Sequence, residues 1–118
     1  MVAILLTKHC LVDFVLQTPY QLKNKHQYGH PGGLLHGFLH VLGTLPIFAV
    51  IPPTPAIAAA IIGGEFVAHY HIDWAKEQAL RRTGWGYTDS RYWAVFGADQ
   101  LLHGLTYVAM SWALTLPV

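Results

Sequence analysis

The sequence predicts an all-α protein: a four-helix transmembrane bundle with a layer of histidine and aspartate side chains near its cytoplasmic side. Three observations support this fold class. Four apolar stretches each approach the ~20 residues that a helix needs to cross a bilayer. Charged residues make up only 11% of the 118 residues, while 53% are hydrophobic. The chain also holds eight histidines, more than its six carboxylates.

The expected helices cover residues 1–18, 33–51, 55–80 and 91–116, in a single domain of residues 1–118. We expect the first to end before Pro19, the second to end before Pro52, and the third to begin at Pro55, a favoured first-turn residue. Their apolar residues do not alternate, which argues against half-buried strands. The first stretch is not read as a secretory signal, since it lacks a basic leader and Lys8 interrupts it.

The distribution of positive charge supports a membrane topology. Six of the seven Lys and Arg residues lie in or beside the first and third connections, and the second connection has none. The positive-inside rule then predicts a multi-pass protein with both of these connections in the cytoplasm and both termini outside. A soluble or peripheral helical bundle is the alternative, because the mean hydropathy is only +0.36.

Composition excludes several other classes. A disordered chain would be polar and highly charged. The net charge of +1 and the lack of a basic helix give no indication of nucleic-acid binding. A single cysteine, Cys10, cannot form an internal disulfide.

The ionisable residues follow a helical spacing. Seven pairs among the His, Asp and Glu residues lie four positions apart. Random placement would give roughly 1.5 such pairs, and this interval puts two side chains on one helical face. Every predicted helix contributes one pair of this kind: His9 and Asp13, His36 and His40, His69 and Asp73, Asp99 and His103. All four pairs have a member within roughly 5–12 Å of the cytoplasmic helix ends, at ~1.5 Å per residue.

Such a layer of five imidazoles and three carboxylates predicts a metal site, because helix bundles build metal centres from inward residues on facing helices. Eight ligands suit about two divalent transition-metal ions, with zinc as the first choice and Mn, Fe or Co as alternatives. The opposing interpretation is that each pair is only hydrogen-bonded and fixes helix packing. Four pairs at matching depth favour metal.

The positions of the remaining ionisable residues along the predicted helices suggest their roles. The layer's own carboxylates, Asp13, Asp73 and Asp99, together with Lys76, are the candidate catalytic groups. Glu65 extends the third helix's polar face one turn deeper, as a proton-transferring group or as a partner that orients His69. We expect two loop histidines and one helical histidine to stay outside the layer: His26, His30 and His71.

The ordered motifs resemble one uncharacterised family. The chain carries His-x-x-x-Asp-Phe with Gln-Thr from His9 onward, then a lysine at Lys23 or Lys25. It continues with the 36/40 histidine pair, His-x-x-Ile-Asp-x-x-Lys from His69, and Asp-Gln-x-x-His from Asp99. This pattern resembles small four-helix membrane proteins of bacteria and their phages, grouped as a domain of unknown function. That family is similar in turn to YdjM-type proteins, described as membrane-bound metal-dependent hydrolases. The resemblance implies a bacterial inner-membrane protein.

Four functions compete. The leading hypothesis is a membrane-embedded metal-dependent hydrolase whose substrate is a membrane lipid or a lipid-linked ester or phosphoester, in which Lys23, Lys25 and Lys76 hold a phosphate. A small cation or proton transporter, working as a homo-oligomer, is the second. Haem binding is disfavoured by the carboxylates beside each histidine. A non-catalytic membrane protein with a stabilising metal is the fourth.

Overall fold

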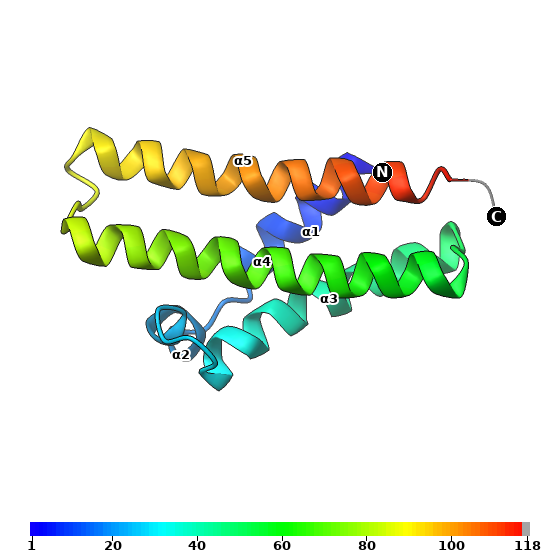
Figure 1. The fold of residues 1–118 in the computed structure, drawn as a ribbon, viewed down its shortest axis with the longest axis horizontal. Helices are drawn as coiled ribbons and strands as arrows, with labels where there is room; N and C mark the ends of the chain where they lie inside the picture. Colours follow the sequence, from blue (N-terminus) through cyan, green and yellow to red (C-terminus); the bar gives the residue numbers. More distant parts are fainter. Residues whose placement is uncertain (117–118) are drawn as a thin grey trace.

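The computed structural model describes residues 1–116 and is helical, with no strand in that part of the chain. Its five helices are α1 (Val2–Phe14), α2 (Pro19–Asn24), α3 (Pro31–Val50), α4 (Pro55–Thr83) and α5 (Ser90–Ala113). α4 and α5 form a long antiparallel hairpin, and α3 crosses it obliquely (Figure 1). α1 packs between α3 and α5, which closes a four-helix bundle. The bundle measures 47 × 27 × 22 Å.

Both connections that carry Lys and Arg lie at one end of the bundle. The linker that contains α2 and the α4–α5 turn are found there, while the N-terminus and the α3–α4 turn lie at the other end (Figure 1). We call these the loop end and the terminal end. The all-α expectation is confirmed for the described residues, and the chain direction alternates through the four long helices as expected.

Local sequence explains most helix ends. Three of the four long helices have an N-cap residue whose side chain accepts a backbone N–H: His30 for α3, Thr54 for α4 and Asp89 for α5. α4 ends at Gly84, whose φ of +70° favours glycine. Arg91 binds both carboxylate oxygens of Asp89, at 3.0 and 2.7 Å, and this holds the pKa of that carboxyl below its usual range.

The first predicted helix is longer than the observed one. α1 ends at Phe14 instead of near residue 18, and the chain then turns at Leu16, whose N–H bonds to the Leu11 carbonyl. Pro19 disfavours a helical conformation at Thr18, which is extended and instead caps α2. This short helix was not predicted, because residues 19–32 were expected to form only a connection.

The expectation of four membrane spans is only partly met. Among the described residues, α3 alone is long and apolar enough to cross a membrane by length and composition. α1 has 13 residues, about 20 Å, which is shorter than a bilayer core. α4 and α5 are long enough, but their interior His, Asp, Glu and Lys residues lower their hydropathy.

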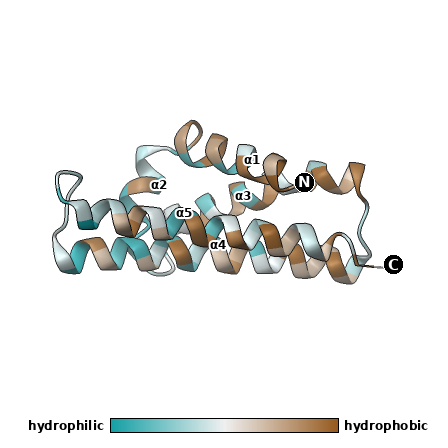
Figure 2. Cartoon of the chain, turned by 90° about the horizontal axis from the view of Figure 1, so that it is seen from above, coloured by the Kyte–Doolittle hydropathy of each residue, from teal (hydrophilic) through white to brown (hydrophobic). Residues whose placement is uncertain are grey.

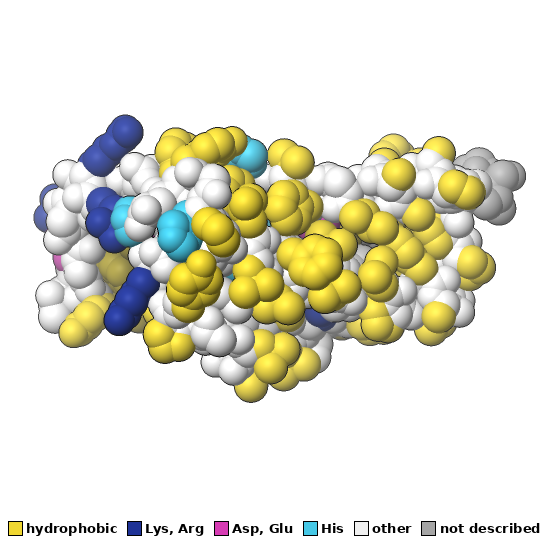
Figure 3. All heavy atoms as spheres, turned by 90° about the horizontal axis from the view of Figure 1, so that it is seen from below, with side chains coloured by type: hydrophobic (Ala, Val, Ile, Leu, Met, Phe, Trp, Pro, Cys, Tyr) yellow, Lys and Arg dark blue, Asp and Glu magenta, His cyan; other side chains and the backbone are white. Residues whose placement is uncertain are grey.

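Polar and apolar residues are arranged unusually for a soluble bundle. Among residues 1–116, buried positions include 13 polar or charged residues and only eight hydrophobic ones, while 25 large hydrophobic residues are exposed. Buried polar groups and exposed apolar patches are the informative departures from normal burial. Hydrophilic residues concentrate towards the loop end (Figure 2), and hydrophobic side chains cover much of the face in Figure 3. The buried apolar cluster lies towards the terminal end and consists of Leu5, Ile47, Ile61, Tyr107 and Met110.

Candidate metal centre

Eight polar side chains from the four long helices meet inside the bundle, and they are the eight predicted from four-residue spacing. Each is at most 8% exposed. They form three overlapping groups, in each of which the potential ligand atoms lie within 4.8 Å of one another. The groups are Asp13, His36, His40 and His69; His9, His69 and His103; and Asp73, Asp99 and His103. His69 and His103 each belong to two groups, so the eight residues form one continuous site, which we call the layer.

Two carboxylates connect most of the layer. Asp13 Oδ1 lies 2.9 Å from both His36 Nε2 and His40 Nε2. Asp73 Oδ2 lies 3.4 Å from both His36 Nε2 and His69 Nε2, and its Oδ1 lies 3.4 Å from His103 Nε2. At the α5 side, Asp99 Oδ1 is 3.5 Å from His103 Nε2. Asp13 and Asp73 therefore each face several imidazoles at once, whereas Asp99 faces His103.

The donor set fits divalent metal ions. The buried ring nitrogens of the layer are not all hydrogen-bonded: His40 Nδ1 and His69 Nδ1 have no partner, and His9 Nε2, His36 Nε2 and His69 Nε2 meet only layer carboxylates. Unpaired buried polar atoms are costly, so their concentration in one place calls for a ligand. Imidazole nitrogen with carboxylate oxygen is a donor set that zinc, iron and manganese accept.

The linker helix α2 contributes to this site, which sequence reasoning missed. Gln21 is 2% exposed, and its Oε1 lies 3.2 Å from His36 Nδ1. An amide oxygen only accepts hydrogen bonds, so His36 donates from Nδ1 and leaves Nε2 free for an ion. Gln21 lies three residues after Thr18, the N-cap of α2. The Thr18-Pro19 sequence, which is typical of a helix start, could have predicted this short helix.

Lysines border the layer at the loop end. Lys25 is 4% exposed, and its Nζ lies 2.7 Å from Asp73 Oδ2. Lys76 Nζ lies 3.6 Å from Asp99 Oδ1 and 3.9 Å from Asp73 Oδ1. Lys23, the third predicted phosphate-holding lysine, is exposed on α2 and does not border the layer.

A cavity of about 180 Å³ adjoins the layer between α1, the α2 linker, α4 and α5. Its polar wall includes Asp13, Lys25 and Lys76. Phe14 and Leu22 also line it and are 60% and 53% exposed, so the cavity reaches the surface. The layer can therefore be approached from the loop end.

A second polar centre lies deeper, towards the terminal end. Lys8 forms an ion pair with Glu65, and its Nζ also donates to the His40 carbonyl oxygen at 3.2 Å. Thr44 Oγ1 donates to the other Glu65 oxygen at 2.6 Å. Glu65 thus bonds to Lys8 and Thr44, so its expected role as the partner that orients His69 is wrong. Tyr107 instead links the two centres: its hydroxyl lies 3.3 Å from Lys8 Nζ and 3.0 Å from His9 Nδ1.

The three remaining histidines lie outside the layer. His26 is partly exposed, and His71 is exposed and contacts the Tyr28 hydroxyl at 2.8 Å. His30 has a structural role, because its Nδ1 accepts the Gly32 N–H at the start of α3. His30 therefore lies outside the layer, as expected, and serves as the N-cap of α3.

The chain belongs to a family of proteins of unknown function, DUF3307, whose model matches residues 1–118. This supports the resemblance to an uncharacterised family. Searches of curated proteins and of solved structures found no match, so the comparisons add no support for a likeness to YdjM-type proteins or for a bacterial or phage source.

Proposed function

We propose that this chain is a membrane-embedded metal-dependent hydrolase of a lipid or a lipid-linked ester or phosphoester. The observation that carries the proposal is the layer of eight nitrogen and oxygen ligands, not all of which are hydrogen-bonded, beside a cavity that opens at the loop end. A structural metal site is filled by about four protein ligands per ion and needs no cavity beside it.

About two divalent ions, with zinc as the first choice, fit the layer. The first group and the third group share no residue, and together they offer two sets of ligands. Two such ions lower the pKa of water and stabilise charge on the oxygens of the reacting ester.

The chain's own residues have distinct tasks in this proposal. Asp13 lines the cavity and lies beside two imidazoles, so it is the carboxylate best placed to take a proton from water entering there. Asp73 and Asp99 hold imidazoles and lysines in place. Lys76 neutralises negative charge on the substrate. In the reaction a water oxygen bonds to the acyl carbon or phosphorus, and the alcohol leaves with the electron pair and one proton.

The surface supports a multi-pass membrane placement. Large hydrophobic side chains are exposed on all four long helices, and six of the seven Lys and Arg residues lie in or near the loop-end connections. Seven of the ten Tyr and Trp residues also lie in these connections or within three helical turns of them, as interfacial aromatic residues do: Tyr20, Tyr28, Trp74, Trp85, Tyr87, Tyr92 and Trp93. The loop end is then cytoplasmic, and both termini are outside.

Single-cysteine labelling tests this placement. In a Cys10→Ser background, Gln27→Cys and Thr88→Cys should react only with reagent on the cytoplasmic side, and Pro52→Cys only with reagent outside. Labelling of Gln27→Cys from the outside alone would overturn the orientation.

Two features weigh against the transporter alternative. Glu65, the deep carboxylate on which a relay depended, is paired with Lys8 and Thr44. Beyond that pair, towards the terminal end, lies the apolar cluster around Leu5, Ile47 and Ile61, which offers no site for an ion.

The decisive experiment combines elemental analysis with vesicle assays. The gently purified protein should contain about two transition-metal ions per chain, and reconstituted vesicles should show lipid turnover without cation uptake. The double variant Lys8→Met/Glu65→Gln removes both deep charges together; it should keep turnover, whereas a transporter would lose its ion flux. A folded protein without stoichiometric metal would refute the site, and uptake without turnover would refute the hydrolase.

A further inference from the structure

The cavity beside the layer has two walls of opposite character. One wall carries the ammonium groups of Lys25 and Lys76 next to the layer. The other is apolar and includes Phe14, Tyr92 and Phe96. The Lys76 Nζ lies 5.9 Å from the Phe96 ring centre, where the two walls meet.

Both ammonium groups are withdrawn from water. The side chains of Lys25 and Lys76 are 3% and 14% exposed. Each is aimed at layer carboxylates, and a ligand that enters the cavity meets these two positive groups beside Asp13. Lysine binds phosphate as a point charge with three donors.

The formal charge of the site with two divalent ions bound indicates which charge its substrate should carry. Three layer carboxylates, two cavity lysines and the Glu77 side chain at the cavity wall together carry −2 with neutral imidazoles. The deeper Lys8–Glu65 pair contributes nothing. Two divalent ions would bring the sum to +2, and buried charge without a counter-charge is costly. A neutral ester leaves this excess in place, whereas a phosphate monoester, which carries about −1.5 to −2 at pH 7, removes it.

We infer that the cavity binds the terminal phosphate of a phosphate monoester carried on an apolar chain. The phosphate lies against Lys25 and Lys76, and the first atoms of the apolar chain lie along the aromatic wall. This rests on the proposed function and narrows its substrate class from esters in general to phosphate monoesters.

Inorganic phosphate is the probe. Zinc-loaded protein in detergent is titrated with phosphate by calorimetry, with zinc content measured on the same samples. The wild-type protein should bind phosphate saturably. Lys25→Met and Lys76→Met should each weaken phosphate binding roughly 10- to 100-fold, the loss expected for a hydrogen bond to a charged group, while zinc content stays unchanged. The exposed Lys23→Met is the matched control and should bind as the wild type does.

Charge-retaining variants separate binding from folding. Lys25→Arg and Lys76→Arg should keep most of the phosphate affinity, although methionine at either position does not. Equal affinity in the methionine variants and the wild type would overturn the inference, because phosphate would then bind elsewhere. Full zinc loading with turnover of neutral carboxylic esters, but no phosphate binding, would also overturn it while leaving the hydrolase proposal intact. Failure to load zinc would refute both.

Discussion

Two buried polar centres lie in adjacent parts of the same bundle, and they differ in how their atoms are satisfied. In the layer, His40 Nδ1 and His69 Nδ1 lack hydrogen-bond partners, and single oxygens of Asp13 and Asp73 each face two imidazole nitrogens. In the deeper centre, Lys8 directs its ammonium at Glu65, the His40 carbonyl oxygen and Tyr107, and Thr44 bonds the second Glu65 oxygen. No side-chain atom of Lys8, Thr44, Glu65 or Tyr107 is among the unpaired ones.

This difference separates a structural polar cluster from one that is built for a ligand. A saturated network is complete in the folded chain and holds helices in register. An unsaturated network of similar burial is stable only when something else completes it. We therefore expect variants of the layer to change ligand content, and variants of the deeper centre to change stability alone.

The largest effect is expected at His69, which belongs to two of the three ligand groups. His69→Ala should lower metal affinity by about 100-fold or more, since each ligand supplies a large part of the binding free energy. It should also lower the melting temperature, because the loss of metal leaves buried carboxylates facing one another. Metal content and thermal unfolding in detergent measure both effects.

His26→Ala is the matched control, because this partly exposed histidine belongs to none of the three ligand groups. It should keep both the metal content and the melting temperature. If His26→Ala lost metal as His69→Ala does, the layer would not be the binding site.

The sequence predicted the layer well because its signal is local. Pairs such as His9 and Asp13 are four residues apart on one helix, so periodicity identifies them without knowledge of the fold. The deeper centre has no such signal, because Lys8 and Glu65 lie 57 positions apart in the sequence. They meet only because α1 and α4 both pack against α3. α2 was missed for a related reason, since its Gln21 and Lys25 are buried only by tertiary contacts with α3 and α4. The number of membrane spans predicted from the apolar stretches was too high for two reasons. The polar residues that face the interior lower the mean hydropathy of α4 and α5, and α1 is shorter than the predicted helix.

The second prediction concerns the saturated centre. Lys8→Met or Glu65→Gln alone leaves the opposite charge buried and unpaired, which should cost about 3–5 kcal/mol of unfolding free energy. The double variant Lys8→Met/Glu65→Gln should recover most of this loss. Thermal unfolding of all four proteins gives the coupling, and metal content should be the same in each. Loss of metal from the double variant would show that the deeper centre belongs to the metal site.

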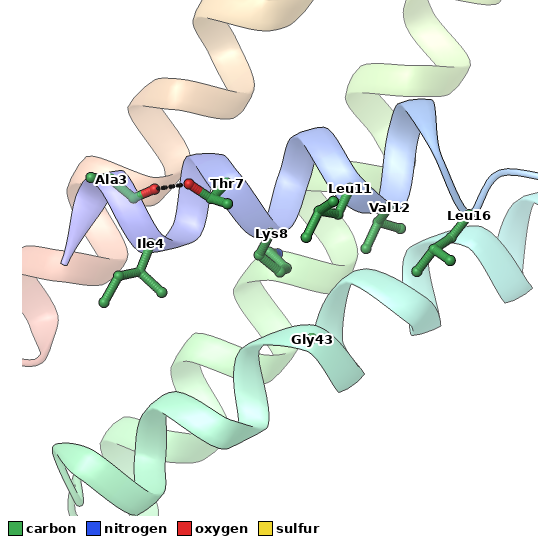
Figure 4. Close-up of a pocket in the computed structure, with 8 residues that line it drawn as sticks. All are labelled: Ala3, Ile4, Thr7, Lys8, Leu11, Val12, Leu16 and Gly43. Carbon is green, nitrogen blue, oxygen red and sulfur yellow. Dashed lines mark hydrogen bonds between the residues drawn. The ribbon is translucent and has the colours of Figure 1, made fainter.

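The third prediction tests how Lys8 reaches its partners. Figure 4 shows Lys8 directed from α1 towards Gly43 on α3, and a Cβ added at Gly43 would lie 2.7 Å from Lys8 Cδ. Gly43→Ala should therefore displace the lysine and cost about 1–3 kcal/mol through overpacking. Gly63→Ala is the control, because a Cβ there meets nothing within 4 Å. Equal melting temperatures of the two variants would mean that the lysine stem moves freely.

The smallest effect, and the sharpest comparison, is expected at Gln21, which touches the layer without belonging to it. Its Oε1 accepts from His36 Nδ1 and so fixes the tautomer that leaves Nε2 free. Gln21→Met keeps the length of the side chain but removes the acceptor, and it should weaken metal binding by about tenfold. Gln21→Glu keeps an acceptor and cannot donate, so it should bind metal at least as tightly as the wild type. Chelator competition measures both affinities, and ¹⁵N spectra of labelled histidine report which ring nitrogen carries the proton. If Gln21 served packing alone, Met would replace it without loss and the buried charge of Glu would be the harmful change, which is the reverse of the order predicted here.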